Sequence, residues 1–118
     1  IYERPERVFV ADFIGAANLI RGDVAAGRFT AAEGGGFVPA GGEADGAATL
    51  LVRPEDMLLA RDGEGTPGTV AAHFYAGRDR RYQVLTEAFG PLIADTAERW
   101  DEGASVRVRF GKQRLLRG

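Results

Sequence analysis

The sequence predicts a mainly β protein, a small barrel of short antiparallel strands preceded by one N-terminal helix. Runs of β-branched, aromatic and leucine residues recur after residue 17, separated by turn-forming residues. Seventeen of the 118 residues are glycine, concentrated at 34–46 and 63–68, which favours tight turns over long helices. Seven or eight short strands with turns at such spacing are typical of a closed or nearly closed β-barrel.

The first fifteen residues, IYERPERVFVADFIG, predict the helix. Pro5 suits its first turn, because the missing N–H has no partner there, and Gly15 suits its C-terminal end. The segment is apolar around much of its circumference, so another surface must cover it. We expect four apolar side chains to pack onto a neighbouring copy or onto the barrel: those of Val8, Phe9, Phe13 and Ile14.

The sequence predicts four extended regions in the first half of the barrel. Glycine interrupts the first of them, and Pro54 ends the third, since proline cannot donate a hydrogen bond to a strand ladder. The expected regions are 18–33, broken at Gly22 and Gly27, then 37–38, 49–52 and 57–60.

The second half contains the clearest hairpin, in which residues 68–77 and 80–88 are joined by a turn with Gly77 available for positive φ. SVRVRFG (105–111) alternates strictly and places Val106, Val108 and Phe110 on one face. Three further elements are expected: a strand in 90–97, a turn of helix near 98–102 and an edge strand in 114–117.

Composition excludes several classes of site. The chain has no cysteine, which excludes disulfides and thiolate metal sites. No apolar run approaches the roughly 18 residues of a membrane-spanning helix. The net charge of −2 is uneven, with −4 over residues 1–60 and +2 over 61–118. The basic last fifteen residues fit either a patch for an anionic partner or a solvated strand face with a tail.

No motif in the sequence assembles a catalytic, cofactor or metal site. Gly63–Gly68 matches G-x-G-x-x-G but leads into a strand, whereas dinucleotide binding needs a helix there. The only Gly-Lys pair precedes Gln113, so there is no P-loop. His73 and Ser105, the only histidine and serine, lie on plain strands without ligand spacing or a nucleophile elbow.

The segment Arg53-Pro54-Glu55-Asp56 holds charges rigidly where a hydrophobic strand ends. One interpretation is a strand-end turn with a local arginine–carboxylate pair, worth about 0–1 kcal/mol. The other is an interface anchor, in which the arginine fork binds a partner carboxylate. The spacing leaves both open.

Three stretches in order resemble the C-terminal part of ATP-binding subunits of bacterial ABC importers, above all those for polyamines and ferric iron. The first stretch matches the end of the family's ATPase domain and the residues that follow it, at Tyr2, Pro5, Phe9–Ala11, Phe13–Gly15 and Asn18-Leu19. Val52–Asp56 matches V-R-P-E-D, and a hairpin motif matches Gly68, Val70, Tyr75, Gly77, Tyr82 and Val84. The ending RFGKQRLLRG and the glycine-rich loop 34–46 depart from the family pattern.

The resemblance implies that residues 1–16 are the remnant of an ATPase domain and linker. Residues 17–118 would be an OB-like transport-associated (TOBE) regulatory and dimerisation domain without catalysis or a cofactor of its own. ATP and Mg would act in the parent ATPase. The partners would be a second copy of the subunit, with Arg53, Glu55, Asp56, Phe9, Phe13 and Ile14 as candidate interface residues, and membrane permease subunits through the parent protein. The domain would be cytoplasmic and peripheral to the inner membrane, without direct membrane insertion.

Two other functions are weighed against this one. The alternative is a small-oxyanion sensor, with Arg78, Arg80 and Arg81 as candidate anion-binding residues. A nucleic-acid-binding barrel ranks last, because the pI is about 5.4 and lysine is scarce, although aromatic residues flank the arginine cluster. No nucleic acid is therefore expected as a partner.

Overall fold

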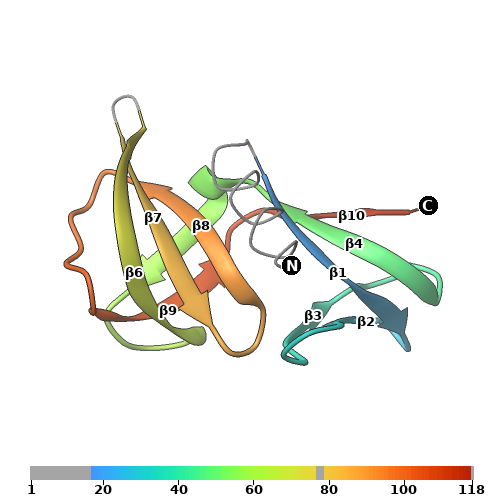
Figure 1. Ribbon diagram of the computed structural model, residues 1–118. Helices are drawn as coiled ribbons and strands as arrows, with labels where there is room; N and C mark the ends of the chain where they lie inside the picture. The colour runs from blue at the N-terminus through green and yellow to red at the C-terminus, as the bar shows by residue number, and fades with distance from the viewer. Residues whose placement is uncertain (1–16, 77–78, 118) are drawn as a thin grey trace, which may run out of the picture.

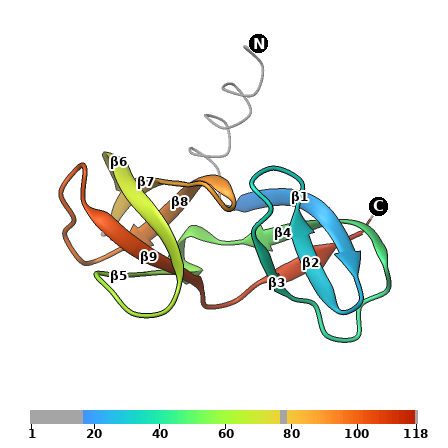
Figure 2. The same ribbon diagram turned by 90° about the horizontal axis from the view of Figure 1, so that it is seen from below.

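The structure is a computed structural model that describes residues 17–76 and 79–117. These residues form ten strands and one short 3₁₀ helix, arranged in two five-stranded antiparallel sheets that lie side by side (Figures 1 and 2). Sheet A has the strand order β10-β4-β1-β2-β3, and sheet B has the order β5-β9-β6-β7-β8. The prediction of a mainly β, antiparallel protein is confirmed.

The strands of sheet A come from both ends of the described chain. Their bounds are β1 Asn18–Ala25, β2 Arg28–Ala31, β3 Phe37–Pro39, β4 Gly46–Val52 and β10 Arg114–Leu116. The loose alternation predicted for the first region is an inward–outward pattern along β1, with Asn18, Ile20, Gly22 and Val24 buried. The expected edge strand at the chain's end is confirmed as β10, which pairs with β4.

Sheet B contains the predicted hairpin. Its bounds are β5 Met57–Ala60, β6 Thr66–Ala76, β7 Asp79–Thr86, β8 Gly90–Thr96 and β9 Ser105–Phe110. The helix η1, Pro54–Asp56, begins where Pro54 ends the ladder of β4, as predicted. The sheet curls, so that η1 and β5 both contact β8 and the strands form a half-barrel.

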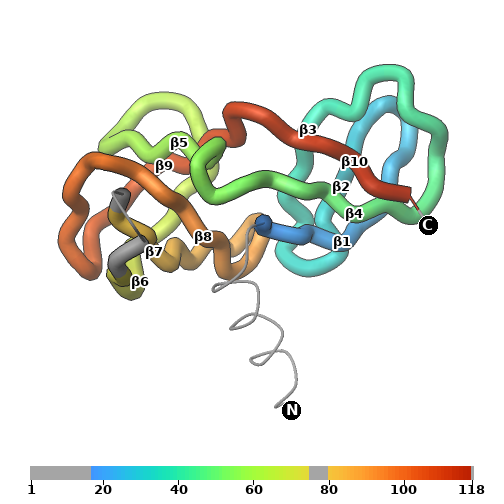
Figure 3. The backbone as a smooth tube through the Cα atoms, turned by 90° about the horizontal axis from the view of Figure 1, so that it is seen from above, coloured from blue at the N-terminus to red at the C-terminus, as the bar shows by residue number. Residues whose placement is uncertain are grey.

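The strands do not form the single barrel that the sequence predicted. The chain passes from sheet A to sheet B through η1 and returns between β9 and β10, and both passages are visible in Figure 3. Each strand's local pattern is compatible with either arrangement, because it does not specify the distant pairing partner. Residues 98–102 form a loop and not a turn of helix, because the backbone here bonds to sheet B, with Trp100 N donating to the Tyr82 hydroxyl and Gly103 N to Val70 O. The predicted helix within residues 1–15 lies outside the described residues.

One hydrophobic core joins the two sheets. It includes Ile20, Phe29 and Leu50 from sheet A and Tyr82 and Val108 from sheet B. Burial of this continuous apolar surface stabilises the sheets as one unit.

A buried asparagine bridges the sheets at the start of β1. The Asn18 side chain is 4% exposed, and its Nδ2 donates to Val52 O at 3.0 Å and to Ile93 O at 2.9 Å. Its Oδ1 accepts from Ile93 N at 2.7 Å. Because one backbone group donates and two accept, the amide orientation is fixed chemically. Asn18 therefore satisfies the backbone at the edge of β8 as a neighbouring strand would.

Two glycines make the second bridge. Gly36 N donates to Ala88 O at 2.8 Å, joining the β2–β3 loop of sheet A to the β7–β8 loop of sheet B. A Cβ on Gly34 would lie 2.1 Å from Glu87 O, and one on Gly36 would lie 2.7 Å from Ala88 O. The backbones approach this closely only because neither residue has a side chain.

Candidate functional site

The predicted interface anchor, Arg53–Asp56, lies at the passage between the two sheets. Arg53 and Glu55 are exposed, Pro54 is buried, and Asp56 is half-buried. Backbone hydrogen bonds hold the turn: Asp56 N donates to Arg53 O at 2.9 Å, Met57 N donates to Pro54 O, and Gly111 N donates to Asp56 O at 2.6 Å. The charged side chains therefore sit on a rigid backbone at the surface, which fits both interpretations of the motif.

An ion pair on β7 and β8 lies near this turn. Arg81 Nε donates to Asp95 Oδ1 at 2.8 Å and Arg81 Nη2 to Asp95 Oδ2 at 2.9 Å, in the two-point geometry of an arginine fork. The Asp95 hydrogen bonds raise the pKa of Arg81, and the charge of Glu55 acts in the same direction. Glu55 is thus electrostatically coupled to sheet B as well as exposed.

The candidate anion-binding arginines do not form one cluster in the described part of the chain. Arg80 and Arg81 are consecutive on β7, so their side chains leave opposite faces of the strand. Arg81 is held by Asp95, and Arg80 Nη1 donates to Ala97 O at 3.1 Å. Arg78 lies outside the described residues, as do the interface candidates Phe9, Phe13 and Ile14.

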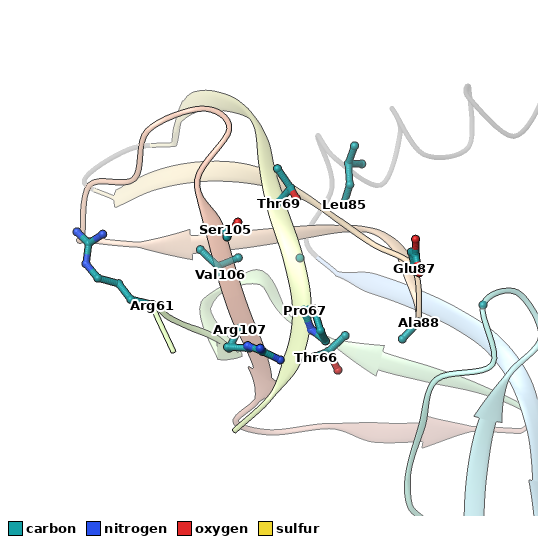
Figure 4. A pocket seen from close by; sticks show the side chains of 12 residues that line it. Arg61, Thr66, Pro67, Thr69, Leu85, Glu87, Ala88, Ser105, Val106 and Arg107 are labelled. Carbon is teal, nitrogen blue, oxygen red and sulfur yellow. The ribbon is translucent and has the colours of Figure 1, made fainter. Parts of the chain in front are cut away.

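A cleft of ≈ 710 Å³ crosses the surface of sheet B (Figure 4). Thr66, Pro67 and Thr69 of β6 lie along it, with Arg61 on one side and Glu87 and Ala88 on the other. Ser105 and Arg107 of β9 and Leu85 of β7 complete its labelled lining with Val106. Its charged groups come from separate loops and strands and do not converge on one point.

The described residues that line the cleft include no nucleophile–base pair. Ser105 lines it, whereas His73 lines a different, smaller cavity and stacks on Tyr82 with ring centroids 5.0 Å apart. Among residues 17–76 and 79–117, no group of three metal-ligating side chains comes together.

The smaller cavity contains a residue that the sequence analysis did not single out. Trp100 is buried, although the sequence places it between Arg99 and Asp101 in a charged loop. A lone tryptophan flanked by charges is the signal that could have identified it, because so large an apolar side chain is usually anchored in a core.

The comparisons with known proteins agree with the fold. The family model described as TOBE domain matches residues 50–116, more than half of the chain. The chain belongs to the TOBE domain family. The resemblance predicted from the sequence is thus confirmed at the level of the family.

Curated relatives of this TOBE domain are ATP-binding proteins of import systems. The spermidine/putrescine import protein PotA 1 of Pseudomonas aeruginosa is 42% identical over 95% of this chain and 34% of its own length. The Fe(3+) ions import protein FbpC of Brucella abortus is 34% identical over 82% of this chain and 29% of its own. The sulfate/thiosulfate import protein CysA of Caulobacter vibrioides is 46% identical over 53% of this chain and 18% of its own length. The chain spans about a third or less of each relative.

A solved structure shares the fold. The cytoplasmic molybdate-binding protein ModG, crystallised with molybdate bound, aligns with a TM-score of 0.64 over 84% of this chain and 94% of its own. The sequences are 14% identical, so the likeness shows the fold alone. Within the residues that the structure describes, no helix has the length and apolar character needed to cross a membrane.

Proposed function

We propose that this chain is the accessory TOBE segment of an ABC importer's ATP-binding subunit, and that it acts by contact with a second copy, without catalysis of its own. The observation that carries the proposal is the pattern of matches. Import ATP-binding proteins for polyamines and ferric iron match along 82–95% of this chain, yet the chain spans only about a third of each.

In this proposal residues 1–16 are the end of the ATPase domain and its linker, and residues 17–118 are the regulatory domain. ATP and Mg act in the remainder of the subunit. The subunit contacts membrane permease partners on the cytoplasmic side, and the identity of the transported solute is determined outside this segment.

Exposed features of sheet A and of η1 support contact between copies. Strands β3 and β10 are the two edges of sheet A, and an unpaired edge is a template for pairing with another chain. Both edges carry exposed apolar side chains, Phe37 at 59% and Leu116 at 36%. Arg53 and Glu55 add charges on a rigid turn, where they can pair with the same residues of a second copy around a two-fold axis.

Analytical ultracentrifugation of the 118-residue chain tests this proposal. We expect a concentration-dependent dimer that Glu55→Arg weakens, because the reversed charge opposes Arg53 of the second copy. Glu64→Arg is the matched control, since Glu64 is also exposed but lies in the loop between β5 and β6. A strict monomer at high concentration, or equal effects of the two variants, would contradict self-association through this turn.

Small-oxyanion sensing by the hairpin arginines has less support. Arg81 is held by the two-point contact with Asp95, which leaves its guanidinium already neutralised. Arg80 donates to a backbone carbonyl of the following loop. These contacts favour a structural role for both residues on the hairpin.

A further inference from the structure

The side of sheet B that faces away from the core carries an apolar surface over strands β6, β7 and β8. The register pairs Leu85 with Thr69 on one side and with Pro91 on the other, and alternation places all three side chains on this surface. Leu85 and Thr69 also line the larger cleft (Figure 4). The same registers add two further rows, Gln83 with Ala72 and Ile93, and Arg81 with Phe74 and Asp95. We call these nine residues the outer face.

The outer face is largely apolar, and its two charged residues neutralise each other. Leu85 is 45% exposed and Phe74 is 46% exposed. Arg81 and Asp95 form the ion pair described above, with Nε and Oδ1 2.8 Å apart. Five of the nine residues are apolar: Ala72, Phe74, Leu85, Pro91 and Ile93. A contiguous apolar surface without net charge suits a partner that is itself apolar.

One residue of the outer face is buried although it faces away from the core. Ile93 is 1% exposed, but alternation turns its side chain away from the core that Leu92 and Ala94 join. Its backbone N and O both bond to the Asn18 side chain, so Ile93 lies beside the start of β1. Residues 1–16 join the described chain at this same point. Burial on the outer face is therefore deepest where that segment enters.

Residues 1–15 have the length and composition that such a surface requires. As the helix that the sequence predicts, fifteen residues extend about 22 Å, whereas the distance from β8 to β6 across the sheet is about 10 Å. A helix that is apolar around much of its circumference needs cover on more than one side. The apolar side chains that need cover are those of Ile1, Tyr2, Val8, Phe9, Val10, Phe13 and Ile14.

We propose that residues 1–15 of this chain dock on the outer face of sheet B, from Ile93 on β8 across Leu85 on β7 toward Thr69 on β6. In the subunit proposed above, these residues end the ATPase domain, so docking connects that domain directly to the half-barrel. The ATPase domain then covers the side of the segment that the outer face leaves uncovered. Docking within one chain does not depend on self-association or on the identity of the parent subunit, so this proposal and the proposed function can fail separately.

A nitroxide label on the segment tests where it lies. The chain has no cysteine, so Glu6→Cys provides a single labelling site in the 118-residue chain. Paramagnetic broadening is read from the amide cross-peaks of ¹H–¹⁵N spectra, with the reduced nitroxide as the reference. We expect strong broadening at Gln83 and Leu85, because the docked segment lies across β7. Broadening at Leu58 should be weaker, since β5 is three strands away from β7 in the order of sheet B.

Substitutions assign the docking to the outer face. Leu85→Gln should weaken docking about tenfold, because it removes apolar surface that docking buries. Leu58→Gln is the matched control, since Leu58 is 44% exposed on β5 of the same sheet, and it should leave docking unchanged. Phe13→Gln alters the segment and not sheet B, and it should act in the same direction as Leu85→Gln.

Trypsin cleavage of the Arg7–Val8 bond, followed by mass spectrometry, provides a second readout. A docked segment is cleaved only while it is detached, so the cleavage rate follows the detached fraction. The rate should rise up to about tenfold in Leu85→Gln and in Phe13→Gln, and it should not change in Leu58→Gln.

Three results would overturn the proposal. Equal broadening at Gln83 and at Leu58 would show that the segment does not dock on the outer face. Broadening of an unlabelled ¹⁵N chain mixed with the nitroxide-labelled chain would identify a second copy as the source of the docked segment. Equal cleavage rates in Leu85→Gln and Leu58→Gln would place any contact of the segment elsewhere.

Discussion

The two sheets have the same number of strands, but they are stabilised by different means. Sheet A packs its fully buried Phe29 and Leu50 where its strands approach closely, and a Cβ on its Gly22 would lie 2.1 Å from Thr30 O and 2.7 Å from the Phe29 ring. Sheet B relies on large side chains with polar links, such as the fully buried Tyr82, whose hydroxyl serves both Trp100 and Glu98. Sheet A ends in two exposed edges, whereas sheet B curls until β5 and β8 meet.

The match to the family model follows this division. Residues 50–116 contain all of sheet B. From sheet A they contain only the last residues of β4 and the whole of β10. The glycine-rich loop 34–46, which departs from the family pattern, belongs wholly to sheet A. The family model thus covers the half-barrel, whereas PotA 1 of Pseudomonas aeruginosa, which matches 95% of the chain, matches sheet A as well.

The largest effect is expected from uncoupling the sheets at Asn18. Asn18→Ala removes three hydrogen bonds and leaves Ile93 N, Ile93 O and Val52 O buried without them. We expect the free energy of unfolding to fall by about 3–5 kcal/mol, because each buried unpaired group costs about 1–3 kcal/mol. This loss is measured by urea unfolding, with circular dichroism as the signal.

The shape of the urea unfolding transition of Asn18→Ala tests whether this asparagine couples the two sheets. If the asparagine couples the sheets, the variant's transition broadens or separates into two steps. A loss below about 1 kcal/mol with an unchanged slope would show that the shared core alone couples them.

A smaller effect is expected at the glycine bridge. Gly34→Ala places a Cβ 2.1 Å from Glu87 O and demands φ +86° of a residue with a side chain, so the two loops must separate. We expect a loss of about 3 kcal/mol in thermal or urea unfolding.

Gly35→Ala is the control for this substitution. Gly35 has a similar φ of +72° but nothing within 4 Å of its added Cβ, so only the backbone strain of about 1–2 kcal/mol remains. Equal losses in the two variants would mean that the close approach between the sheets contributes nothing.

The smallest effect is expected from the ion pair within sheet B. Asp95→Asn removes the charge from a two-point contact whose side chains are 16% and 13% exposed. We expect a loss of about 1–2 kcal/mol, since hydrogen bonds to charged groups contribute more than neutral ones.

An exposed ion pair beside sheet A, between the loop after β3 and the residue after β10, provides the comparison. Arg117 Nε lies 3.8 Å from Glu43 Oε1, and the two side chains are 34% and 48% exposed, respectively. Glu43→Gln should therefore change the free energy of unfolding by less than about 0.5 kcal/mol. A larger loss for Glu43→Gln than for Asp95→Asn would reverse the proposed contrast between the sheets.

The local features of this protein could be predicted from neighbouring residues alone. Period-two alternation placed Val106 and Val108 on the buried face of β9, and Pro54 ended β4, because both follow from the chemistry of neighbouring residues. The hairpin of β6 and β7 was also predictable, since only two residues separate its strands in the sequence. The interface role of Arg53 and Glu55 stays a prediction; both are exposed. Arg80 and Arg81 leave opposite faces of β7, which the sequence alternation already implied.

Only the tertiary structure decided how the strands divide between two sheets and which residues join them. Asn18 meets Ile93, 75 positions away, and the loop at Gly34 meets the loop at Glu87. Such contacts depend on where distant segments are placed in space. The alternation of buried and exposed residues along a strand does not specify which strand it pairs with. Trp100 and Arg80 form one cavity for the same reason: the fold brings together a loop and a strand whose sequences give no sign of each other.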